Sequence, residues 1–345
     1  MIPQREYFDK DIANSDNTSG YYIIEENDFV YNPRKSTDAP YGPISSYKYA
    51  EAGIVSPLYL CFRAKKEINP SFFEWYFRSS AWHRYVYMSG DSGARHDRVS
   101  IKDDTFFAMP INLPSAHEQE HIASFLERID QRIEKQRALV ESLKKYKRGV
   151  VSAILSHQMM FSYADGKHYP EWTSCALQDA VDFLDGQRKP LESADRARRQ
   201  GIYPYYGASG IIDYIDDYIF DEPLLLLGED GANIINRSTP LCFIATGKYW
   251  VNNHAHVMRP KKGHNIKFLC ELLESLDYTR YNTGTAQPKL NQEKCRGIEL
   301  VLPIYEEQCR IADFLSSLDQ KIEREQDTLD CLLLLKRGMM QQLFI

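Results

Sequence analysis

The stretch LPSAHEQEHIASFLERIDQRIEKQ, residues 113–136, returns near the C-terminus as LPIYEEQCRIADFLSSLDQKIERE, residues 302–325. When the two copies are aligned from Pro114 and Pro303, about 15 of 36 positions are identical, and both copies end in the triplet Lys-Arg-Gly. Unrelated sequences would share far fewer positions, so the chain contains an internal repeat. The repeat divides the chain into a mixed segment, a helical segment, a second mixed segment and a second helical segment.

Both copies of the repeat have the pattern of a long helix. The first copy has no Gly or Pro from Ser115 to Arg148, and in each copy apolar residues recur alternately every four and three positions. This period is typical of a coiled-coil seam. A helix with a single apolar stripe is not stable alone in water, so we expect the two helices to pair. The predicted seam consists of Ile129, Ile133, Gln136, Val140, Leu143, Lys147, Leu318, Ile322, Glu325, Leu329, Leu332 and Lys336.

Two polar residues interrupt each seam at equivalent places: Gln136 and Lys147 in the first copy, Glu325 and Lys336 in the second. A parallel pair at equal height would bring the two lysines together. An antiparallel pair instead sets Gln136 opposite Lys336 and Lys147 opposite Glu325. We therefore predict an antiparallel pair whose two polar layers determine the register. Such a pair has an approximate twofold axis, which would relate the two mixed segments.

The mixed segments have the pattern of α/β domains. Short β-branched and aromatic runs predict strands within residues 20–33, 52–64, 222–230 and 240–251. Helices are predicted within residues 70–86, where Pro70 is the first residue, and 266–276. The predicted fold class is α+β, with two α/β domains related by a pseudo-twofold axis and separated by a long antiparallel two-helix coiled coil. The predicted domain boundaries are 1–112, 113–157, 158–301 and 302–345.

The bulk properties restrict the class of protein. A length of 345 residues suits two domains with connecting elements. No apolar run reaches the roughly 18 to 20 residues that span a bilayer, and Arg5, Glu6 and Asp9 stand where a signal peptide would be apolar. We therefore expect a cytoplasmic protein that makes no membrane contact.

Cysteine spacing and net charge argue against two further classes. The seven cysteines include no C-x-x-C pair, so neither a zinc ribbon nor a disulfide framework is indicated. The net charge of −6 argues against a simple nucleic-acid-binding domain, because such domains carry a basic excess. Any binding to DNA must then depend on local patches or on the charge of a partner.

Few sequence motifs suggest a catalytic activity or a metal site. The sequence DAPY, residues 38–41, lacks the second proline of the adenine-methyltransferase motif that it resembles, and no glycine-rich cofactor loop precedes it, so a turn is favoured. His254 and His256 would share one face of a strand and could bind a metal, but no third ligand with suitable spacing is evident. Hydrogen-bonding or packing roles are therefore favoured for both histidines. Glu229 and Asp230 lack the lysine of a nuclease strand motif, so we predict no catalytic residue and no metal site.

The repeated pattern Leu-Pro, Glu-Gln, Ile-Ala-x-Phe-Leu, Asp-Gln-x-Ile-Glu and Lys-Arg-Gly, placed once after each mixed segment, resembles the specificity subunit of type I restriction-modification systems. The second mixed segment adds the sequences GEDGANI, GKYWVNNHAHV and GTAQPKLN, which are similar to members of that family. The resemblance covers nearly the whole chain. The two mixed segments correspond to target recognition domains, and the two helical segments to the central and C-terminal conserved regions.

The resemblance implies a non-catalytic subunit that reads double-stranded DNA. Each recognition domain would read one half of a split target, while the paired helices set the spacing and dock two methyltransferase (M) subunits. These partners would bind S-adenosylmethionine, and this chain would bind no cofactor. Restriction (R) motor-nuclease subunits would complete the complex. The target bases would be read separately from the phosphate contacts that position the protein.

Two departures from the family pattern leave alternatives open. Only 92 residues precede Gly93, whereas 112 separate Trp172 from the equivalent Gly284, so we expect a shortened first recognition domain. The alternative function is therefore a structural or regulatory protein that competes for methyltransferase subunits. The run of leucines at 332–335 also makes the second helix apolar beyond its seam. This extra face would dock a partner or an N-terminal segment, or would pack on the second domain.

Candidate DNA contacts are cationic, amide and aromatic residues on loops marked by Gly and Pro. Cationic side chains would bind phosphates or guanine edges, and amides could read adenine. For each residue, a solvated loop charge or a buried tyrosine is an equal alternative. The candidates are Arg34, Lys35, Tyr41, Arg95, His96, Arg98, Arg188, Lys189, Arg198, Arg199, Tyr205, Tyr206, Gln287 and Lys289.

Overall fold

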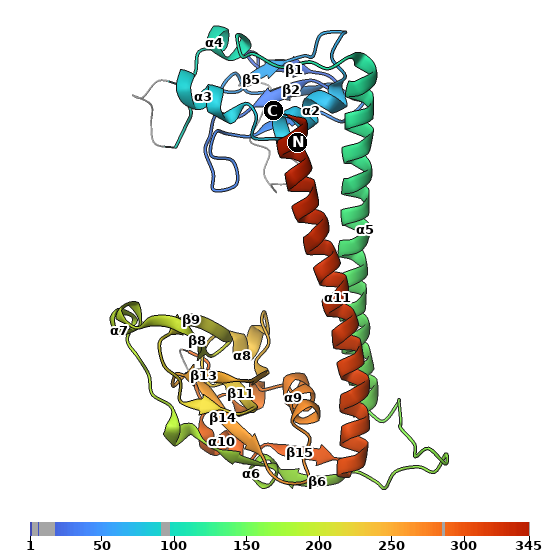
Figure 1. The fold of residues 1–345 in the computed structure, drawn as a ribbon, viewed down its shortest axis with the longest axis vertical. Coiled ribbons are helices and arrows are strands. Elements are labelled where there is room, and N and C mark those ends of the chain that lie inside the picture. Colours follow the sequence, from blue (N-terminus) through green and yellow to red (C-terminus); the bar gives the residue numbers. More distant parts are fainter. Residues whose placement is uncertain (2–5, 7–17, 91–96, 285–286, 345) are drawn as a thin grey trace. The chain divides into compact units, whose positions relative to one another are not determined.

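Two long helices form the framework of the protein (Figure 1). They are α5 (Ala116–Leu155) and α11 (Tyr305–Leu343). The computed structural model describes residues 1, 6, 18–90, 97–284 and 287–344. The chain forms two compact units: unit 1 comprises residues 1–139 and 325–345, and unit 2 comprises residues 140–324. Each long helix therefore contributes residues to both units.

The long helices run antiparallel in each unit, as predicted. In unit 1, Gln136 Nε2 donates a hydrogen bond to Glu325 Oε2 at 2.6 Å, and Lys336, later in α11, pairs with Asp130, earlier in α5. In unit 2, Lys147 Nζ lies 2.7 Å from Asp319 Oδ1, and the following turns of α5 pack against the turns of α11 that precede Asp319. All twelve predicted seam residues are buried or half-buried.

The predicted register of the helix pair is wrong. Gln136 pairs with Glu325 in place of Lys336, and Lys147 pairs with Asp319 in place of Glu325. The predicted register assumed that each lysine pairs with a residue at a seam position of the other helix. A lysine has a long flexible side chain, so its ammonium group reaches an aspartate that flanks the seam and forms an ion pair there.

The described residues of unit 1 form two small antiparallel sheets. One has the strand order β3-β2-β5 and the other pairs β1 with β4. The strands are β1 (Tyr22–Ile24), β2 (Phe29–Tyr31), β3 (Ile44–Ser46), β4 (Gly53–Val55) and β5 (Leu60–Phe62). The helices that follow are α2 (Pro70–Arg78), α3 (His83–Ser89) and α4 (Asp103–Phe107).

The single helix predicted over residues 70–86 is interrupted between α2 and α3. Ser79 ends α2, where its Oγ donates to the carbonyl oxygen of Tyr76. The indole Nε1 of Trp82 donates to the carbonyl oxygen of Phe77. Serine competes for backbone groups in this way and favours helix ends over helix interiors.

Unit 2 contains two four-stranded sheets and a short two-stranded sheet. The strand orders are β12-β11-β14-β7, β10-β13-β8-β9 and β15-β6. The strands are β6 (Thr173–Ala176), β7 (Val181–Phe183), β8 (Gln200–Gly207), β9 (Gly210–Ile215), β10 (Phe220–Asp221), β11 (Leu224–Gly228), β12 (Cys242–Ala245), β13 (Lys248–Val251), β14 (Ala255–Pro260) and β15 (Glu299–Leu302). The helices are α6 (Leu177–Ala180), η1 (Asp185–Gln187), α7 (Ser193–Arg198), α8 (Asn233–Asn236), α9 (Ile266–Ser275), η2 (Thr279–Tyr281) and α10 (Gln292–Arg296).

Unit 1 repeats part of the topology of unit 2. The order β3-β2-β5 corresponds to β12-β11-β14, and the antiparallel pair β1-β4 corresponds to β10-β13. Counterparts of β6, β7, β8 and β9 do not occur among residues 18–90 and 97–139, the described part of unit 1 before α11. The α+β class and the two-domain organisation are thus confirmed.

The same glutamine attaches a short helix to a long helix in each unit. Asn69 caps α2, and its backbone N–H donates to Gln119 Oε1 at 2.8 Å. Asn265 caps α9, and its backbone N–H donates to Gln308 Oε1 at 2.9 Å. Both glutamines are almost fully buried and donate through Nε2 to the carbonyl oxygen of the proline that precedes the long helix. The glutamine of the Glu-Gln pair therefore connects each long helix to its α/β domain.

The long helices also complete the hydrophobic core of each unit. Leu126 of α5 is fully buried in a cluster with the aromatic side chains of α2. The equivalent Leu315 of α11 is buried with Phe268 and Leu272 of α9. Burying a leucine side chain contributes about 2 kcal/mol. Among the described residues, no helix is both long enough and apolar enough to cross a membrane.

Candidate nucleic-acid interface

A loop lies against the end of the central strand in both units, where it forms the same pair of backbone hydrogen bonds. In unit 1, Val99 N–H donates to Pro33 O at 2.8 Å, and Lys35 N–H donates to Asp97 O at 2.9 Å. Pro33 follows β2. The loop belongs to the sequence GARHDRVSIKD, whose residues 93–96 lie outside the described residues.

Unit 2 repeats this contact with the loop GTAQPKLNQEK. Leu290 N–H donates to Glu229 O at 2.7 Å, and Gly231 N–H donates to Pro288 O at 3.0 Å. Glu229 directly follows β11, the counterpart of β2. The loop sequences that precede the two long helices therefore occupy equivalent places, and each places a cationic residue, Arg98 or Lys289, beside the end of the central strand.

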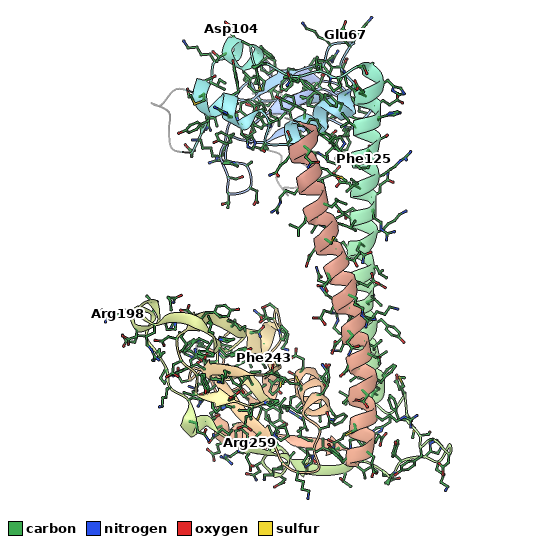
Figure 2. All side chains as sticks on the ribbon, viewed as in Figure 1. Glu67, Asp104, Phe125, Arg198, Phe243 and Arg259 are labelled. Atoms are coloured by element: carbon green, nitrogen blue, oxygen red, sulfur yellow. The ribbon has the colours of Figure 1, made fainter. Side chains whose placement is uncertain are left out.

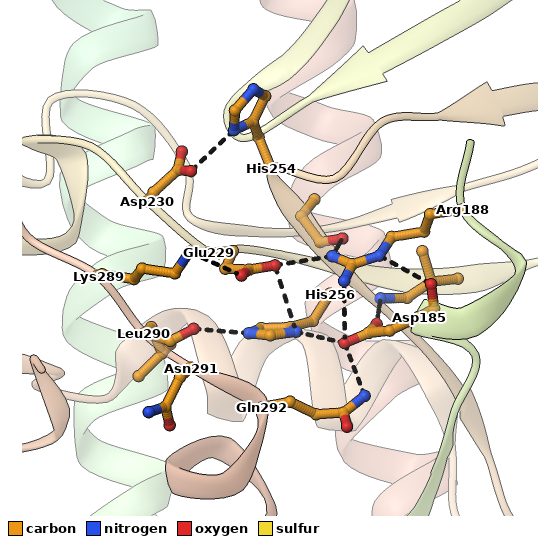
Figure 3. Close-up of polar contacts among 12 residues, drawn as sticks. Asp185, Arg188, Glu229, Asp230, His254, His256, Lys289, Leu290, Asn291 and Gln292 are labelled. Atoms are coloured by element: carbon orange, nitrogen blue, oxygen red, sulfur yellow. Dashed lines mark hydrogen bonds and ion pairs between the residues drawn. The ribbon is translucent and has the colours of Figure 1, made fainter. Parts of the chain in front are cut away.

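His256 anchors this loop in unit 2, and its ring lies beside Leu290 (Figure 3). Its ring is 1% exposed, with Nδ1 2.7 Å from Asp185 Oδ2 and Nε2 2.7 Å from the carbonyl oxygen of Leu290. Both partners are acceptors, so the ring donates from both nitrogens as an imidazolium. Burial acts against this charge, but the contacts with Asp185 and Cys295 outweigh it and raise the pKa of His256 to about 10.

Asp185 is the acceptor at the centre of the network. Its second oxygen, Oδ1, accepts from Val257 N–H at 2.9 Å, and Oδ2 also accepts from Gln292 Nε2 at 2.8 Å. Burial acts to raise the pKa of Asp185, but the hydrogen bond and the charge of His256 lower it overall. The result is a rigid connection between η1, β14 and the loop.

Arg188 is part of the same network. Its Nη1 donates to Glu229 Oε2 at 2.8 Å and to the carbonyl oxygen of Ala255 at 2.7 Å. The side chain is 14% exposed. Arg188 was predicted as a DNA contact. In this structure its guanidinium nitrogens are occupied by protein acceptors, and the side chain connects η1 to β14 and to Glu229.

Lys289 lies at the outer side of this network. Its Nζ is 3.4 Å from Glu229 Oε1, and half of its side chain is exposed. His254 also lies near the surface, where its Nδ1 contacts Asp230 Oδ2 at 2.8 Å. The two histidines thus have separate hydrogen-bonding partners. No group of three or more His, Cys, Asp or Glu side chains in the described part of the chain is placed to hold a metal ion.

A second cluster surrounds Trp250 of β13. Its indole Nε1 donates to the carbonyl oxygen of Lys189 at 2.6 Å, and the guanidinium of Arg199 lies 5.1 Å from the centroid of the indole ring. Arg199 also pairs with Asp216 at 2.9 Å. The side chain of Lys189 is exposed, whereas its backbone is held by the hydrogen bond from Trp250.

The structure corrects the role of Tyr205. It is 1% exposed, and its Oη accepts a hydrogen bond from Leu191 N–H at 2.9 Å. This tyrosine is therefore a core residue. Tyr206 is half-buried against Phe243 and Tyr249, and burial raises the pKa of its hydroxyl.

The other candidates of unit 2 are exposed. Arg198 ends α7 and projects from unit 2 (Figure 2), and Gln287 is exposed in the GTAQPKLN loop. The exposed candidates in this unit are Lys189, Arg198, Gln287 and Lys289.

In unit 1, three cationic candidates lie together. Arg34 forms an antiparallel bridge with Arg98, and Lys35 follows directly. Within the described residues, no carboxylate forms an ion pair with any of the three. Tyr41 is half-buried in a turn, with its ring centroid 4.8 Å from that of His83. Arg95 and His96 lie outside the described residues.

Sequence reasoning missed the acidic residues of the interface. Asp185 and Glu229 hold the cationic side chains in place, and Trp250 positions Lys189. The sequence HAH carried a signal, because a histidine on the buried face of a strand needs a hydrogen-bonding partner. That partner is 71 residues away in the chain and could not be inferred from spacing.

Comparison with protein families gives two matches to one family model. The model describes the type I restriction modification DNA specificity domain and matches residues 9–144 and 169–332. Each matched range contains one mixed segment and most of the helix that follows it.

Curated relatives share part of their length with this chain. A putative type I restriction enzyme specificity subunit of Haemophilus influenzae is 33% identical over 149 residues, which are 43% of this chain and 37% of the relative. The EcoprrI specificity subunit of Escherichia coli is 30% identical over 168 residues, which are 44% of this chain and 41% of the relative. The alignments thus span about two fifths of the length of these relatives.

Solved structures share the fold. The crystal structure of a type I restriction-modification S subunit from M. genitalium has a TM-score of 0.55 at 15% identity, covering 97% of this chain and 87% of that chain. A chain from a structural study of complex assembly in the type I R-M system has a TM-score of 0.59 at 16% identity, covering 93% of this chain and 82% of that chain. At these identities the similarity concerns the fold alone.

Proposed function

Because the chain belongs to the family of type I restriction modification DNA specificity domains, we propose that it is the DNA-reading subunit of a type I restriction-modification complex and has no catalytic activity of its own. The observation that carries this proposal is the repeated interface. In both units a loop lies against the end of the central strand through the same two backbone hydrogen bonds and bears a cationic residue there. Two equivalent readers in one chain suit a target that consists of two half-sites.

The paired helices have two roles in this proposal. They set the spacing between the half-sites, and they dock two methyltransferase subunits. S-adenosylmethionine is bound by those methyltransferase partners, and restriction subunits join the same complex. The complex acts on double-stranded DNA in the cytoplasm.

A charge argument supports a role as part of a complex. The chain has a net charge of −6, and several of the cationic candidates in unit 2 are paired with carboxylates. DNA affinity depends strongly on the number of phosphates that free cationic groups neutralise. Most of the nonspecific affinity would then come from the partner subunits, while this chain supplies discrimination between sequences.

The test is co-expression with a methyltransferase subunit, followed by mapping of the methylated adenines. Methylation at a split motif is the expected result. A chain that forms no complex with methyltransferase subunits would contradict the proposal.

A second candidate function is a competitor that occupies methyltransferase subunits without directing methylation. It is favoured by the net charge of −6 together with the ion pairs of Arg188 and Arg199, which leave the chain few free cationic groups for DNA. In the same experiment this function predicts a stable complex in which no adenine is methylated at a split motif.

A further inference from the structure

A pocket of about 380 Å³ lies in unit 2, between the end of α5, the start of α11 and the connection from α5 to β6. In Figure 1 this connection extends from the long helices on the side away from the strands of unit 2. The pocket is therefore separate from the proposed DNA interface. Its lining includes His157, Met160, Tyr169, Trp172 and Glu307.

Glu307 is the unusual residue of this pocket. It is 5% exposed, and among the described residues no group donates a hydrogen bond to its Oε2. Burial raises the pKa of its carboxyl group, while the indole of Trp172 and the imidazole of His157 act in the opposite direction. A buried carboxylate oxygen without a partner is energetically unfavourable.

The first copy of the repeat shows what Glu307 lacks. The equivalent residue, Glu118, is exposed, and its Oε2 accepts from Ser115 Oγ at 2.7 Å and from Ser115 N–H at 2.9 Å. This arrangement is a capping box. In the second copy Ile304 stands at the position of Ser115, so no side-chain hydroxyl can donate to Glu307. The Glu307 carboxylate therefore does not form the same capping box.

Trp172 lines the pocket together with Glu307, and two neighbouring rings hold its indole. The Trp172 ring centroid lies 4.7 Å from that of His157 and 5.8 Å from that of Phe268, edge to face in both cases. An indole face attracts a cation, and a carboxylate beside it adds an ion pair. A planar guanidinium satisfies both kinds of contact at once.

The rim of the pocket includes exposed apolar side chains. Met160 is 63% exposed and Val301 is 45% exposed, and the charged Glu171 lies beside them. Exposed apolar residues around a charged centre are typical of a protein interface with a buried anchor residue.

We propose that this pocket receives an arginine side chain of a partner protein, with Glu307 as its counter-ion and Trp172 as its aromatic wall. The guanidinium donates to the Glu307 carboxylate once the side chains that cover Oε2 move aside, and Met160 and Val301 cover the stem of the arginine. Because the site lies within unit 2 alone, its test needs neither DNA nor a methyltransferase subunit.

The experiment titrates the full chain with N-acetyl-arginine amide and follows the ¹H–¹⁵N indole signals by NMR, with the Trp172 signal identified from the Trp172→Phe variant. Binding in the millimolar range is expected, because one side chain supplies only part of an interface. The neutral analogue N-acetyl-citrulline amide should bind at least tenfold more weakly. Glu307→Gln should weaken arginine binding at least tenfold, whereas the matched variant Glu118→Gln should leave it unchanged.

Equal binding of the citrulline analogue, or unchanged binding by a folded Glu307→Gln variant, would overturn the proposal. Binding of spermidine but not of the arginine amide would indicate a polyamine site and would overturn it as well. A second measurement in the unmodified chain does not depend on the folding of a variant. The arginine probe should lower the pKa of the Glu307 carboxyl group in ¹³C NMR, and the absence of any change would contradict the assignment.

Discussion

At the scale of single residues, a buried ion pair determines where a surface cation lies. His256 and Asp185 are both buried, yet their contacts hold the backbone carbonyl of Leu290, the neighbour of Lys289. The position of the Lys289 ammonium group therefore depends on buried side chains elsewhere in unit 2. Two predictions follow from this arrangement at the residue scale.

The first concerns Lys289. Replacing Lys289 by Ala should weaken DNA binding by the methyltransferase complex and lower the slope of log affinity against log salt concentration by about 1, as for the loss of one phosphate contact. Binding assays over a range of salt concentrations measure both effects. Lys262, an exposed lysine between β14 and α9, provides the control, because Lys262→Ala should change neither. If Lys289→Ala behaves like this control, Lys289 does not contact DNA.

The second concerns His256 and pH. The folded state raises the pKa of His256 from 6.5 to about 10. Its contribution to stability is therefore fully present below about pH 6.5 and is lost as the pH rises through 10. We expect the free energy of unfolding to fall by roughly 3 kcal/mol more between pH 7 and pH 10 in the natural chain than in His256→Ala. Urea denaturation at the two pH values provides the measurement, and equal pH dependence in both chains would refute the prediction.

At the scale of elements, the repeat encodes the attachment of a short helix to a long one. Gln308 connects α9 to α11, and Gln119 connects α2 to α5, through equivalent hydrogen bonds. Gln308→Ala leaves a buried backbone N–H and a buried carbonyl oxygen without partners, and should destabilise unit 2 by about 2 kcal/mol. Gln119→Ala should have a similar effect on unit 1.

Hydrogen exchange separates the two effects of these glutamine variants. Gln308→Ala should accelerate exchange in α9 but not in α2, and Gln119→Ala should do the reverse. Uniform acceleration in both short helices would show that the attachments are not independent.

The aspartate of the Asp-Gln pair is a second connection between elements that occurs in both copies of the repeat. Asp319 Oδ1 is 2.7 Å from Lys147 Nζ, and its Oδ2 is 2.6 Å from Lys267 Nζ of α9. Burial acts to raise the pKa of Asp319, but the hydrogen bonds of the two lysines lower it overall. Its contribution to stability is therefore present above about pH 3.8 and is lost as the pH falls through the lowered pKa.

Asp319→Asn should destabilise unit 2 at neutral pH by about 1 kcal/mol, a value that allows for solvent screening at this half-buried site. Both lysines keep a partner in Glu271, which limits the loss. Asp130→Asn is the matched variant in unit 1, where Asp130 pairs with Lys336. Denaturation over a series of pH values from 7 downward should show that the difference between Asp319→Asn and the natural chain is present above about pH 3.8 and shrinks as the pH falls through the lowered pKa of Asp319. A difference that does not change with pH would contradict an electrostatic origin.

At the scale of the whole molecule, the proposed function predicts that changes in each unit alter only one half of the target. Lys289→Ala belongs to unit 2, and Arg34→Ala belongs to unit 1. Mapping of methylated adenines should show relaxed or weakened selection in a different half-site for each variant. Altered selection in the same half-site for both variants would exclude independent reading by the two units.

Much of the architecture follows from the sequence by itself. The repeat, the helical period and the matched polar positions were sufficient to predict two long antiparallel helices joined to two α/β domains. The physical reason is that periodicity and helix capping are local properties, and two copies of one helix are subject to the same rules. The family pattern in the two helical segments depends on the same local residues, including the Gln and Asp that attach the domains.

Which polar groups meet depends on contacts between residues far apart in the chain. The register of the helix pair depends on how far Lys147 and Lys336 reach beyond the seam, and that reach is not visible in the periodicity. The burial of Tyr205 and the pairing of His256 with Asp185 depend on which strands become neighbours, and strand order is not a local property. The repeated LP…EQ…IA.FL stretch determined the framework, whereas contacts between residues far apart in the chain determined the charges that the interface presents.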